Sequence, residues 1–223
     1  MSAEVLLNFH GIGEPHGGVE ADERPYWITE GFFDAIVALA DRRRDVSVGF
    51  TFDDGNRSDL LIAAPRLERS GRTGAFFVLA GRFAQPDYLS EADVAELVRR
   101  SHRVGLHGVD HVDWRSCDTP SLDRETVDAR YRVAAAAGVP VEEVAIPFGA
   151  YDARVIRRLR RQGFARIYTS DGGWADTRAL VAERTSIRSD MTLPQIEALL
   201  DRREPLKRRA RRWVSTRLRR FVL

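Results

Sequence analysis

Short apolar runs rich in β-branched and aromatic residues alternate with longer amphipathic stretches along most of the chain. The apolar runs are nearly continuous, and this pattern is typical of parallel strands that are buried on both faces. We expect strands at Val5–Phe9, Val46–Phe52, Gly74–Leu79, Val104–His107, Val144–Pro147, Ala165–Thr169 and near Arg184–Arg188.

The stretches between these strands have the periodicity of amphipathic helices. Ser90, Ser121 and Thr192 precede three of them and are expected to act as N-caps. Pro65 lies inside another, so we expect that helix to be kinked or split. The expected helices are Thr29–Arg43, Asp59–Arg69, Ser90–Arg103, Ser121–Ala137, Asp152–Gln162 and Thr192–Arg203.

The order of these elements predicts an α/β fold in which repeated strand–helix units form a parallel sheet with right-handed crossovers. Two architectures satisfy this order: a barrel of about seven or eight units, or an open doubly wound sheet. We favour the barrel. In either case the chemistry should gather at the carboxyl ends of the strands.

Composition narrows the possibilities for the protein. A chain of 223 residues with 43% apolar content is long enough to bury the core of one ordinary domain. The single cysteine, Cys117, excludes a disulfide scaffold and a thiolate-rich metal site, so any metal must bind to His and carboxylate ligands. Because Met1–Phe9 lacks the features of a secretory signal, we expect a cytoplasmic protein.

The net charge of +2 conceals an uneven distribution of charged residues. Arg202–Arg220 holds ten basic residues and one acid, which leaves 25 basic and 32 acidic residues, a net charge of −7, in residues 1–201. We therefore expect a catalytic body over 1–201 and a separate basic tail over 202–223.

The tail is expected to form a basic amphipathic helix. Its apolar residues recur every three or four positions, and arginines fill most of the remainder. This pattern suits the surface of an anionic membrane, and it equally suits a helix packed on the body with a solvated arginine face. Nucleic-acid binding ranks third, because no recognised nucleic-acid module accompanies the arginines. The apolar positions are Leu206, Ala210, Trp213, Val214, Leu218 and Phe221.

Two adjacent carboxylates follow the second expected strand, in the pentapeptide TFDDG at Thr51–Gly55. This is the end of the strand at which a barrel keeps its active site, and the glycine allows a sharp turn. A solvated Asp-Gly turn would have the same local sequence. The interpretation of this segment therefore depends on what the other strand ends contribute.

The fourth expected strand supplies such a partner, because His107 and His111 stand at its end. Two imidazoles and one carboxylate make a common metal triad that leaves positions open for water and substrate. Two further segments follow later strands. Pro147–Gly149 combines an apolar wall with a turn whose N–H groups can face a pocket, and Asp171–Trp174 could add an aromatic wall. Either could also be an ordinary loop.

Together these motifs resemble those of the polysaccharide deacetylases of the NodB-homology type, the fourth family of carbohydrate esterases. The resemblance extends from Val5 to about Leu200. TFDDG matches the first family motif completely, and this implies Asp53 as the catalytic base and Asp54 as a metal ligand. The resemblance also implies an irregular (β/α)7 barrel, in agreement with the expected strands.

The other motifs match to different degrees. His107 and His111 match the second motif, H-x-x-x-H, which implies that both bind the metal. Pro147, Phe148 and Gly149 resemble the third motif, Pro-Tyr-Gly, and Asp171 and Trp174 resemble the fourth. These five residues are expected to contact the substrate or its oxyanion.

The clearest departure from the family concerns the general acid. Many members carry it on a late Leu-x-His motif, but no histidine follows His111 in this chain. In relatives that act on bacterial surface polysaccharides, a histidine near the N-terminus has that role. His10 closes the first expected strand and ranks first here, and His16 ranks second. A purely structural role for His10 is the alternative.

A second departure concerns the arginine that usually precedes the third motif, where this chain has Ala145 and Ile146. A nearby cation normally keeps a carboxylate base ionised. Arg184 or Arg188, near the last expected strand, could take its place.

The resemblance implies a metal-dependent hydrolase that removes the N-acetyl group from an acetylated amino sugar in a glycan or glycan precursor. Zinc suits two histidines and an aspartate, and cobalt, nickel or iron would use the same ligands. The tail favours a lipid-linked substrate at the inner face of the plasma membrane. Hydrolysis of another amide or imide bond, and a non-catalytic relative that binds glycan or membrane, are the alternatives.

Overall fold

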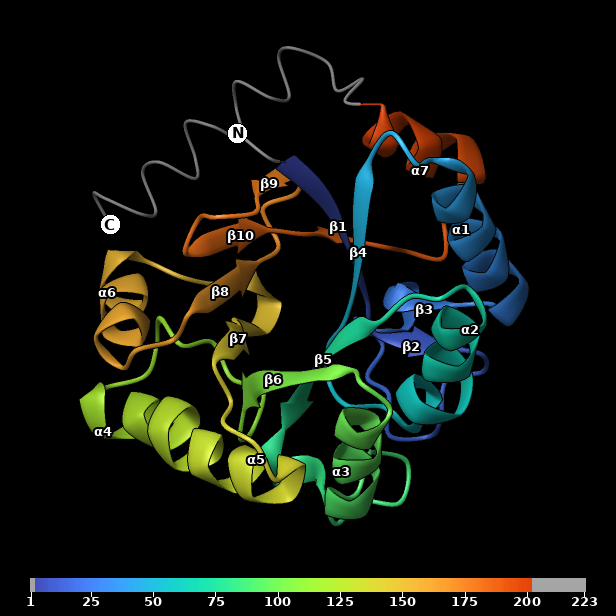
Figure 1. Cartoon of the computed structure of the whole chain (residues 1–223). Coiled ribbons are helices and arrows are strands. Elements are labelled where there is room, and N and C mark those ends of the chain that lie inside the picture. The colour runs from blue at the N-terminus through green and yellow to red at the C-terminus, as the bar shows by residue number, and fades with distance from the viewer. Residues whose placement is uncertain (1–2, 202–223) are drawn as a thin grey trace.

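The computed structural model describes residues 3–201. The fold is α/β, and a sheet of nine strands forms its centre (Figure 1). The strands run in the order β10-β8-β7-β6-β5-β4-β1-β11, with every neighbouring pair parallel, and β9 pairs antiparallel with β1. They are β1 Ala3–Phe9, β4 Ser47–Phe52, β5 Gly74–Leu79, β6 Arg103–Gly108, β7 Glu143–Ala145, β8 Arg166–Thr169, β9 Trp174–Asp176, β10 Val181–Glu183 and β11 Thr185–Ser186. A small second sheet pairs β2 Gly11–Ile12 with β3 Trp27–Ile28.

The two ends of the main sheet are joined by one extended segment. β10 pairs with β8, β11 pairs with β1, and only Arg184 separates β10 from β11. The sheet is therefore nearly closed, which confirms the expected irregular barrel in place of an open doubly wound sheet. The last strand, expected near Arg184–Arg188, is the shorter β11, Thr185–Ser186, and β10 precedes it.

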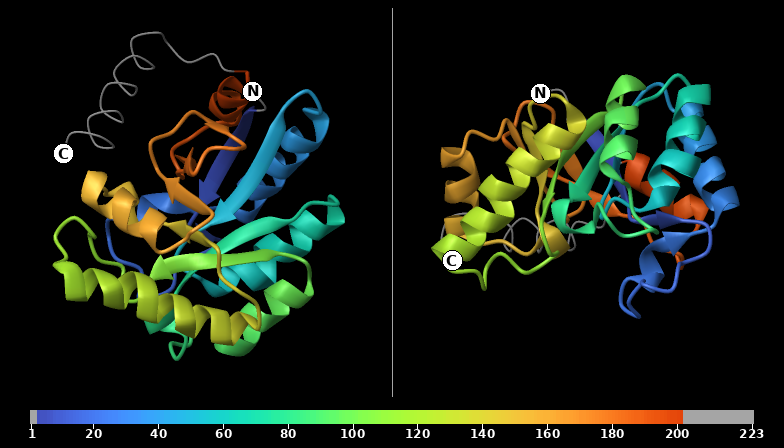
Figure 2. Two further views of the ribbon diagram at one scale, coloured as in Figure 1. Left: turned by 60° about the vertical axis from the view of Figure 1, so that its left-hand side comes forward. Right: turned by 90° about the horizontal axis from the view of Figure 1, so that it is seen from below.

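Helices surround the barrel on its outer side (Figures 1 and 2). A π-helical turn at Asp59–Ala63 precedes α2, and Pro65 stands in the first turn of α2, so the expected break in this helix is confirmed. A second π-helical turn, Arg124–Asp128, joins α4 to α5. The helices are α1 Glu30–Arg42, α2 Ala64–Arg69, α3 Glu91–Arg99, α4 Thr119–Asp123, α5 Ala129–Ala137, α6 Ala153–Arg161 and α7 Leu193–Leu200.

Side-chain caps determine where several helices begin. Ser90 and Asp93 form the reciprocal capping box at the start of α3, as the sequence pattern suggested. The expected cap at Ser121 is wrong. Asp118 accepts the hydrogen bond from the Ser121 N–H, and Pro120 occupies the first turn, where its fixed φ favours a helix that starts earlier.

The hydrophobic core has two parts. The larger part fills the space between the strands and the helices. The smaller part fills the barrel and consists of Leu6, Ala75, Phe77, Ala145, Tyr168, Ala175 and Ala182. Side chains alternate along a strand, so the inward-facing positions come every second residue. The inward-facing positions closest to the carboxyl ends of several strands hold buried polar residues. These are Asn8, Thr51, His107 and Arg184, and they put polar chemistry on top of an apolar interior.

Within residues 3–201, no helix is long and apolar enough to cross a membrane. The basic amphipathic helix expected over 202–223, including the segment 206–223, lies outside the described residues.

Candidate metal centre and active site

Three side chains at neighbouring strand ends form a cluster that could hold a metal. Asp54 follows β4, His107 ends the inward-facing row of β6, and His111 lies on the loop after β6. One ligand atom from each residue lies within 4.8 Å of the other two. The Oδ1 atom of Asp54 is 3.6 Å from Nε2 of His107 and 3.4 Å from Nε2 of His111. The structure thus brings together the metal ligands expected from the sequence.

The spacing within this cluster fits a divalent ion. Two ligand atoms about 2.0 Å from a tetrahedral metal lie about 3.3 Å apart, close to the separations observed here. Asp54 Oδ1 is buried and has no hydrogen-bond partner within the described residues, which is costly unless a cation balances its charge. Asp54 and His111 also adopt positive φ angles, 76° and 55°, that most residues avoid. Strained backbone of this kind is concentrated at functional sites.

His107 is held in the form that a metal requires. Its Nδ1 lies 2.9 Å from the carbonyl oxygen of Ala145, so Nδ1 carries the proton and Nε2 offers a lone pair to the cluster. Burial lowers the pKa of His107 to about 4, although the charges of Asp53 and Asp54 oppose that shift. The imidazole is therefore neutral at neutral pH, which is the state that binds a metal.

Asp53 lies beside the metal ligands but has different partners. Both its oxygens accept hydrogen bonds of 2.7 Å from the Arg184 guanidinium, and Asn8 donates a third at 2.9 Å. Its Oδ2 atom is 3.9 Å from His107 Nε2. Burial disfavours its ionised form, but the charge of Arg184 and its hydrogen bonds oppose burial and keep the pKa of Asp53 below its ordinary value. Asp53 is thus an oriented, ionised carboxylate at the edge of the cluster.

Arg184 takes the place of the arginine that usually precedes the third motif. Its side chain is fully buried, and its guanidinium lies 5.3 Å from the ring centre of Phe77 and 5.6 Å from that of Tyr168. The closure of the barrel brings it there, because Arg184 is the residue between β10 and β11. Arg188, the other candidate, lies over the Tyr26 ring and binds Asp190. Arg184 is therefore the cation that faces Asp53.

The two N-terminal histidines have distinct surroundings. The His10 ring lies 4.8 Å from the ring of Tyr26, and its charge is among those that lower the pKa of both Asp53 and Asp54. Its Nδ1 is buried and has no hydrogen-bond partner within the described residues. His16 is engaged on both nitrogens, by the Asn56 side chain at 3.1 Å and the Gly18 N–H at 3.2 Å. These contacts favour His10 over His16 as a group free to act.

The third-motif loop borders the cluster from the other side. The Phe148 ring lies 4.2 Å from the His111 ring and is 58% exposed, so it marks the mouth of the site. Phe148 itself has a φ of 58°, and its N–H donates no hydrogen bond within the described part of the chain. Pro147 is buried just before it. At Gly149, with a φ of 60°, a Cβ atom would lie only 2.8 Å from Ser170, so this position requires glycine.

Of the two residues that resemble the fourth motif, only Asp171 supports this loop. It accepts hydrogen bonds from the Tyr151 hydroxyl at 2.6 Å and the Thr169 hydroxyl at 2.9 Å, and so ties the third-motif loop to β8. The expected position of Trp174 is corrected. Trp174 begins β9 and pairs with Val5, four residues before the active end of β1, or about 13 Å away along the strand. Its Nε1 donates to the Leu199 carbonyl oxygen, so it packs beneath α7.

No local sequence motif identifies several of the polar residues at the site. Glu125 is buried and accepts hydrogen bonds from the N–H groups of Val109 and Asp110, between the two histidines of the cluster. Asp59 is fully buried without a hydrogen-bond partner among residues 3–201, and burial together with the nearby aspartates raises its pKa well above the ordinary value. Arg82 also lies beside the cluster, with a nitrogen 3.9 Å from Asp54. Only the folded chain reveals these positions.

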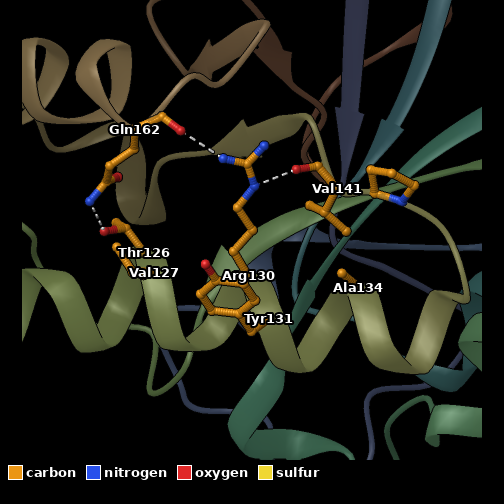
Figure 3. Close-up of a pocket in the computed structure, with 8 residues that line it drawn as sticks. Thr126, Val127, Arg130, Tyr131, Ala134, Val141 and Gln162 are labelled. Carbon is orange, nitrogen blue, oxygen red and sulfur yellow. Dashed lines mark hydrogen bonds between the residues drawn. The ribbon is translucent and has the colours of Figure 1, made fainter.

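A surface pocket of about 370 Å³ lies elsewhere, between α5, the segment before β7 and the end of α6 (Figure 3). Arg130 crosses it and donates to the carbonyl oxygens of Val141 and Gln162, at 2.6 and 2.8 Å. Because β7 and β8 begin beside it, this pocket is near the amino ends of the strands, opposite the cluster. The Arg130 guanidinium is thus held by backbone carbonyl oxygens of the protein itself.

Comparison with known proteins shows which family and which solved structures this architecture resembles. The family model described as polysaccharide deacetylase matches residues 40–167, which is more than half of the chain. The Streptococcus pyogenes deacetylase PplD in complex with acetate aligns with a TM-score of 0.76 and 18% identity, over 91% of this chain and 99% of that chain.

Two further solved structures are similar. BC0361, a polysaccharide deacetylase from Bacillus cereus, aligns with a TM-score of 0.75 and 18% identity, over 89% of this chain and 69% of that chain. IcaB from Ammonifex degensii aligns with a TM-score of 0.70 and 20% identity, over 90% and 97%. At these identities the likeness establishes a shared fold.

Proposed function

The chain belongs to the polysaccharide deacetylase family, and on that premise we propose that it is a metal-dependent hydrolase that removes the N-acetyl group from an acetylated amino sugar. One observation carries the proposal. The buried, unpartnered Oδ1 of Asp54 faces Nε2 of both histidines at 3.4 and 3.6 Å, and an ionised Asp53 is fixed beside them. A cation site and a base next to each other are what the hydrolysis of an amide needs.

Asp54, His107 and His111 would hold the ion, with zinc as the first choice and cobalt, nickel or iron as alternatives. When bound, a divalent ion supplies Lewis acidity to the acetamide and makes water a stronger acid. The neutral state of His107 and the unpartnered oxygen of Asp54 support this assignment.

Asp53 is the proposed base that takes a proton from the attacking water. Its low pKa keeps it ionised at neutral pH, and Arg184 and Asn8 fix the plane of its carboxylate. Because these partners hold Asp53 before substrate arrives, little reorganisation is required during the reaction.

Two other groups have proposed roles in the breakdown of the amide. The unpaired N–H of Phe148 would donate to the oxyanion that develops on the acetamide oxygen. His10 would deliver the proton that the departing nitrogen needs to leave as an amine, and its buried Nδ1, which has no hydrogen-bond partner within residues 3–201, supports that role. The products would be acetate and a free amino sugar.

The substrate is proposed to be a lipid-linked glycan at the inner face of the plasma membrane. The basic, amphipathic pattern of residues 206–223 supports this proposal, because anionic lipids attract such segments. The protein would then be cytoplasmic and peripheral to the membrane.

Acetate release tests the proposed function. Purified full-length protein, stripped of metal and then reloaded with one equivalent of zinc or cobalt, would be incubated with a panel of N-acetylated oligosaccharides and lipid-linked sugars. We expect release that requires the added metal. Silence across the panel, with metal confirmed in the protein, would instead favour hydrolysis of another amide or a binding role.

A further inference from the structure

Arg82 is held rigidly beside the proposed metal ligands. It ends the turn Ala80–Arg82, which follows the carboxyl end of β5. The N–H of Gly81 donates to the Val109 carbonyl oxygen at 3.1 Å, and a Cβ atom at Gly81 would lie 2.5 Å from that oxygen. Arg132 donates to the Ala80 carbonyl oxygen at 2.7 Å. The turn is therefore packed directly onto the loop that carries His111.

The guanidinium of Arg82 is mostly buried yet poorly satisfied. Its side chain is 18% exposed and lies over the ring of Tyr88, 4.5 Å from the ring centre. The nearest carboxylate oxygens belong to Glu23 at 3.8 Å and Asp54 at 3.9 Å, both beyond hydrogen-bond range. Within residues 3–201 this side chain donates no hydrogen bond. Its N–H donors therefore remain available to a ligand beside the proposed metal ligands.

The charges around Arg82 favour an anionic ligand. Arg184 already balances Asp53, and a divalent ion would draw on the charge of Asp54. Glu23 is the other carboxylate within 4 Å of Arg82 in the described part of the chain, and it also lies 3.6 Å from His111. With the ion bound, the positive charges of the ion and the two arginines exceed the negative charges of the three carboxylates. The excess positive charge lies next to the N–H donors of Arg82. Planar guanidinium groups recognise carboxylates and phosphates through paired hydrogen bonds.

We propose that Arg82 binds an anionic group, a carboxylate or a phosphate, carried by the substrate close to its acetamido group. The substrate class is therefore an acidic acetylated amino sugar rather than a neutral one. This inference rests on the proposed function, because it places the acetamide at the metal centre. The same paired hydrogen bonds would hold a sugar acid or a sugar phosphate, and the test below separates these two sources.

Binding measurements test this proposal independently of turnover. Zinc-loaded protein carrying Asp53→Asn would be titrated calorimetrically with N-acetylglucosamine, N-acetylmuramic acid and N-acetylglucosamine 6-phosphate. We expect at least one acidic ligand to bind about tenfold or more tightly than the neutral sugar, as one charge-assisted interaction would provide. A carboxylate preference identifies a sugar acid, and a phosphate preference identifies a sugar phosphate.

Variants of Arg82 then assign the preference. Arg82→Gln should abolish it and leave the affinity for N-acetylglucosamine unchanged, and Arg82→Lys should retain part of it. Arg57→Gln is the matched control. Arg57 is exposed on the segment that follows TFDDG, and its guanidinium donates to the Pro86 carbonyl oxygen, so its loss should leave the preference intact. Thermal unfolding and zinc affinity would confirm that each variant is folded.

Two results would overturn the proposal: equal affinities for neutral and acidic ligands, or an equal loss of both in Arg82→Gln. Failure of the proposed function is a separate outcome. If wild-type protein releases no acetate but prefers acidic ligands through Arg82, the anion site stands and the deacetylase does not. If it deacetylates neutral glycans and shows no preference for acidic ligands, the proposed deacetylase stands and the anion site does not.

Discussion

Replacement of Arg184 by methionine should disable the base without removing any proposed metal ligand. Arg184→Met keeps a long apolar side chain against Phe77 and Tyr168 but deletes two hydrogen bonds of 2.7 Å to Asp53. Asp53 is 2% exposed, so its negative charge would lose its main counter-ion inside the protein. Breaking a buried pair in this way costs about 3–5 kcal/mol.

Protonation of Asp53 would relieve part of that cost. Burial is the largest influence on this carboxyl and raises its pKa, and only the opposing charges, with Arg184 first, keep the pKa low. One pKa unit corresponds to about 1.4 kcal/mol, so a loss of about 3 kcal/mol would raise the pKa by about two units. The acid limb of kcat/KM against pH should therefore shift upward by about that amount. At neutral pH, where Asp53 is still ionised, kcat should fall because the carboxylate loses the two hydrogen bonds that fix its plane.

The assay is a pH–rate profile of acetate release by wild-type protein, Arg184→Met and the control Arg188→Met. Arg188 lies over Tyr26 and binds Asp190, so its replacement should leave the acid limb in place. The reasoning would be refuted if Arg184→Met kept the wild-type profile, or if Arg188→Met shifted it instead.

Three further outcomes are expected. Glu125→Leu should weaken zinc binding about tenfold or more, because the N–H groups of Val109 and Asp110 lose their acceptor, while Glu125→Gln retains more affinity; equal zinc affinities in a competition assay would contradict this. His10→Gln should lower kcat about 10²- to 10⁴-fold with zinc retained, and a comparable loss in a His16 variant alone would reverse the assignment. Burial lowers the pKa of His107 from 6.5 to about 4, so between these pH values the folded apo-protein binds fewer protons than the unfolded chain. Its free energy of unfolding should therefore fall as the pH drops from 6.5 to about 4. Denaturant titrations that show no such fall would contradict the burial of His107.

Local patterns were sufficient to predict most of the fold. Buried parallel strands are short continuous apolar runs, so β5 was predicted with the bounds that the structure has, and β1, β4 and β6 to within a residue or two. The carboxyl ends of those strands then located the two aspartates and two histidines. Both levels of inference depend on residues that are adjacent in sequence.

The parts that sequence could not supply depend on how distant segments meet. Arg184 and Arg188 were equal candidates until the closure between β8 and β1 placed Arg184 inside the barrel. Trp174 follows a Gly-Gly pair after β8, and only the antiparallel pairing of β9 shows that the chain has turned away from the site. Arg82 sits in an ordinary turn, and its position follows from the packing of Gly81 on the histidine loop.

The most direct test of the central claim is the metal content of Asp53→Asn, measured together with its acetate release. The proposed function assigns the metal to Asp54, His107 and His111, and the role of base to Asp53. The account predicts that Asp53→Asn binds one equivalent of zinc with wild-type affinity and releases no acetate, whereas Asp54→Asn loses the zinc. Loss of zinc from Asp53→Asn, or full activity in that variant, would contradict the assignment of the base and the metal ligands.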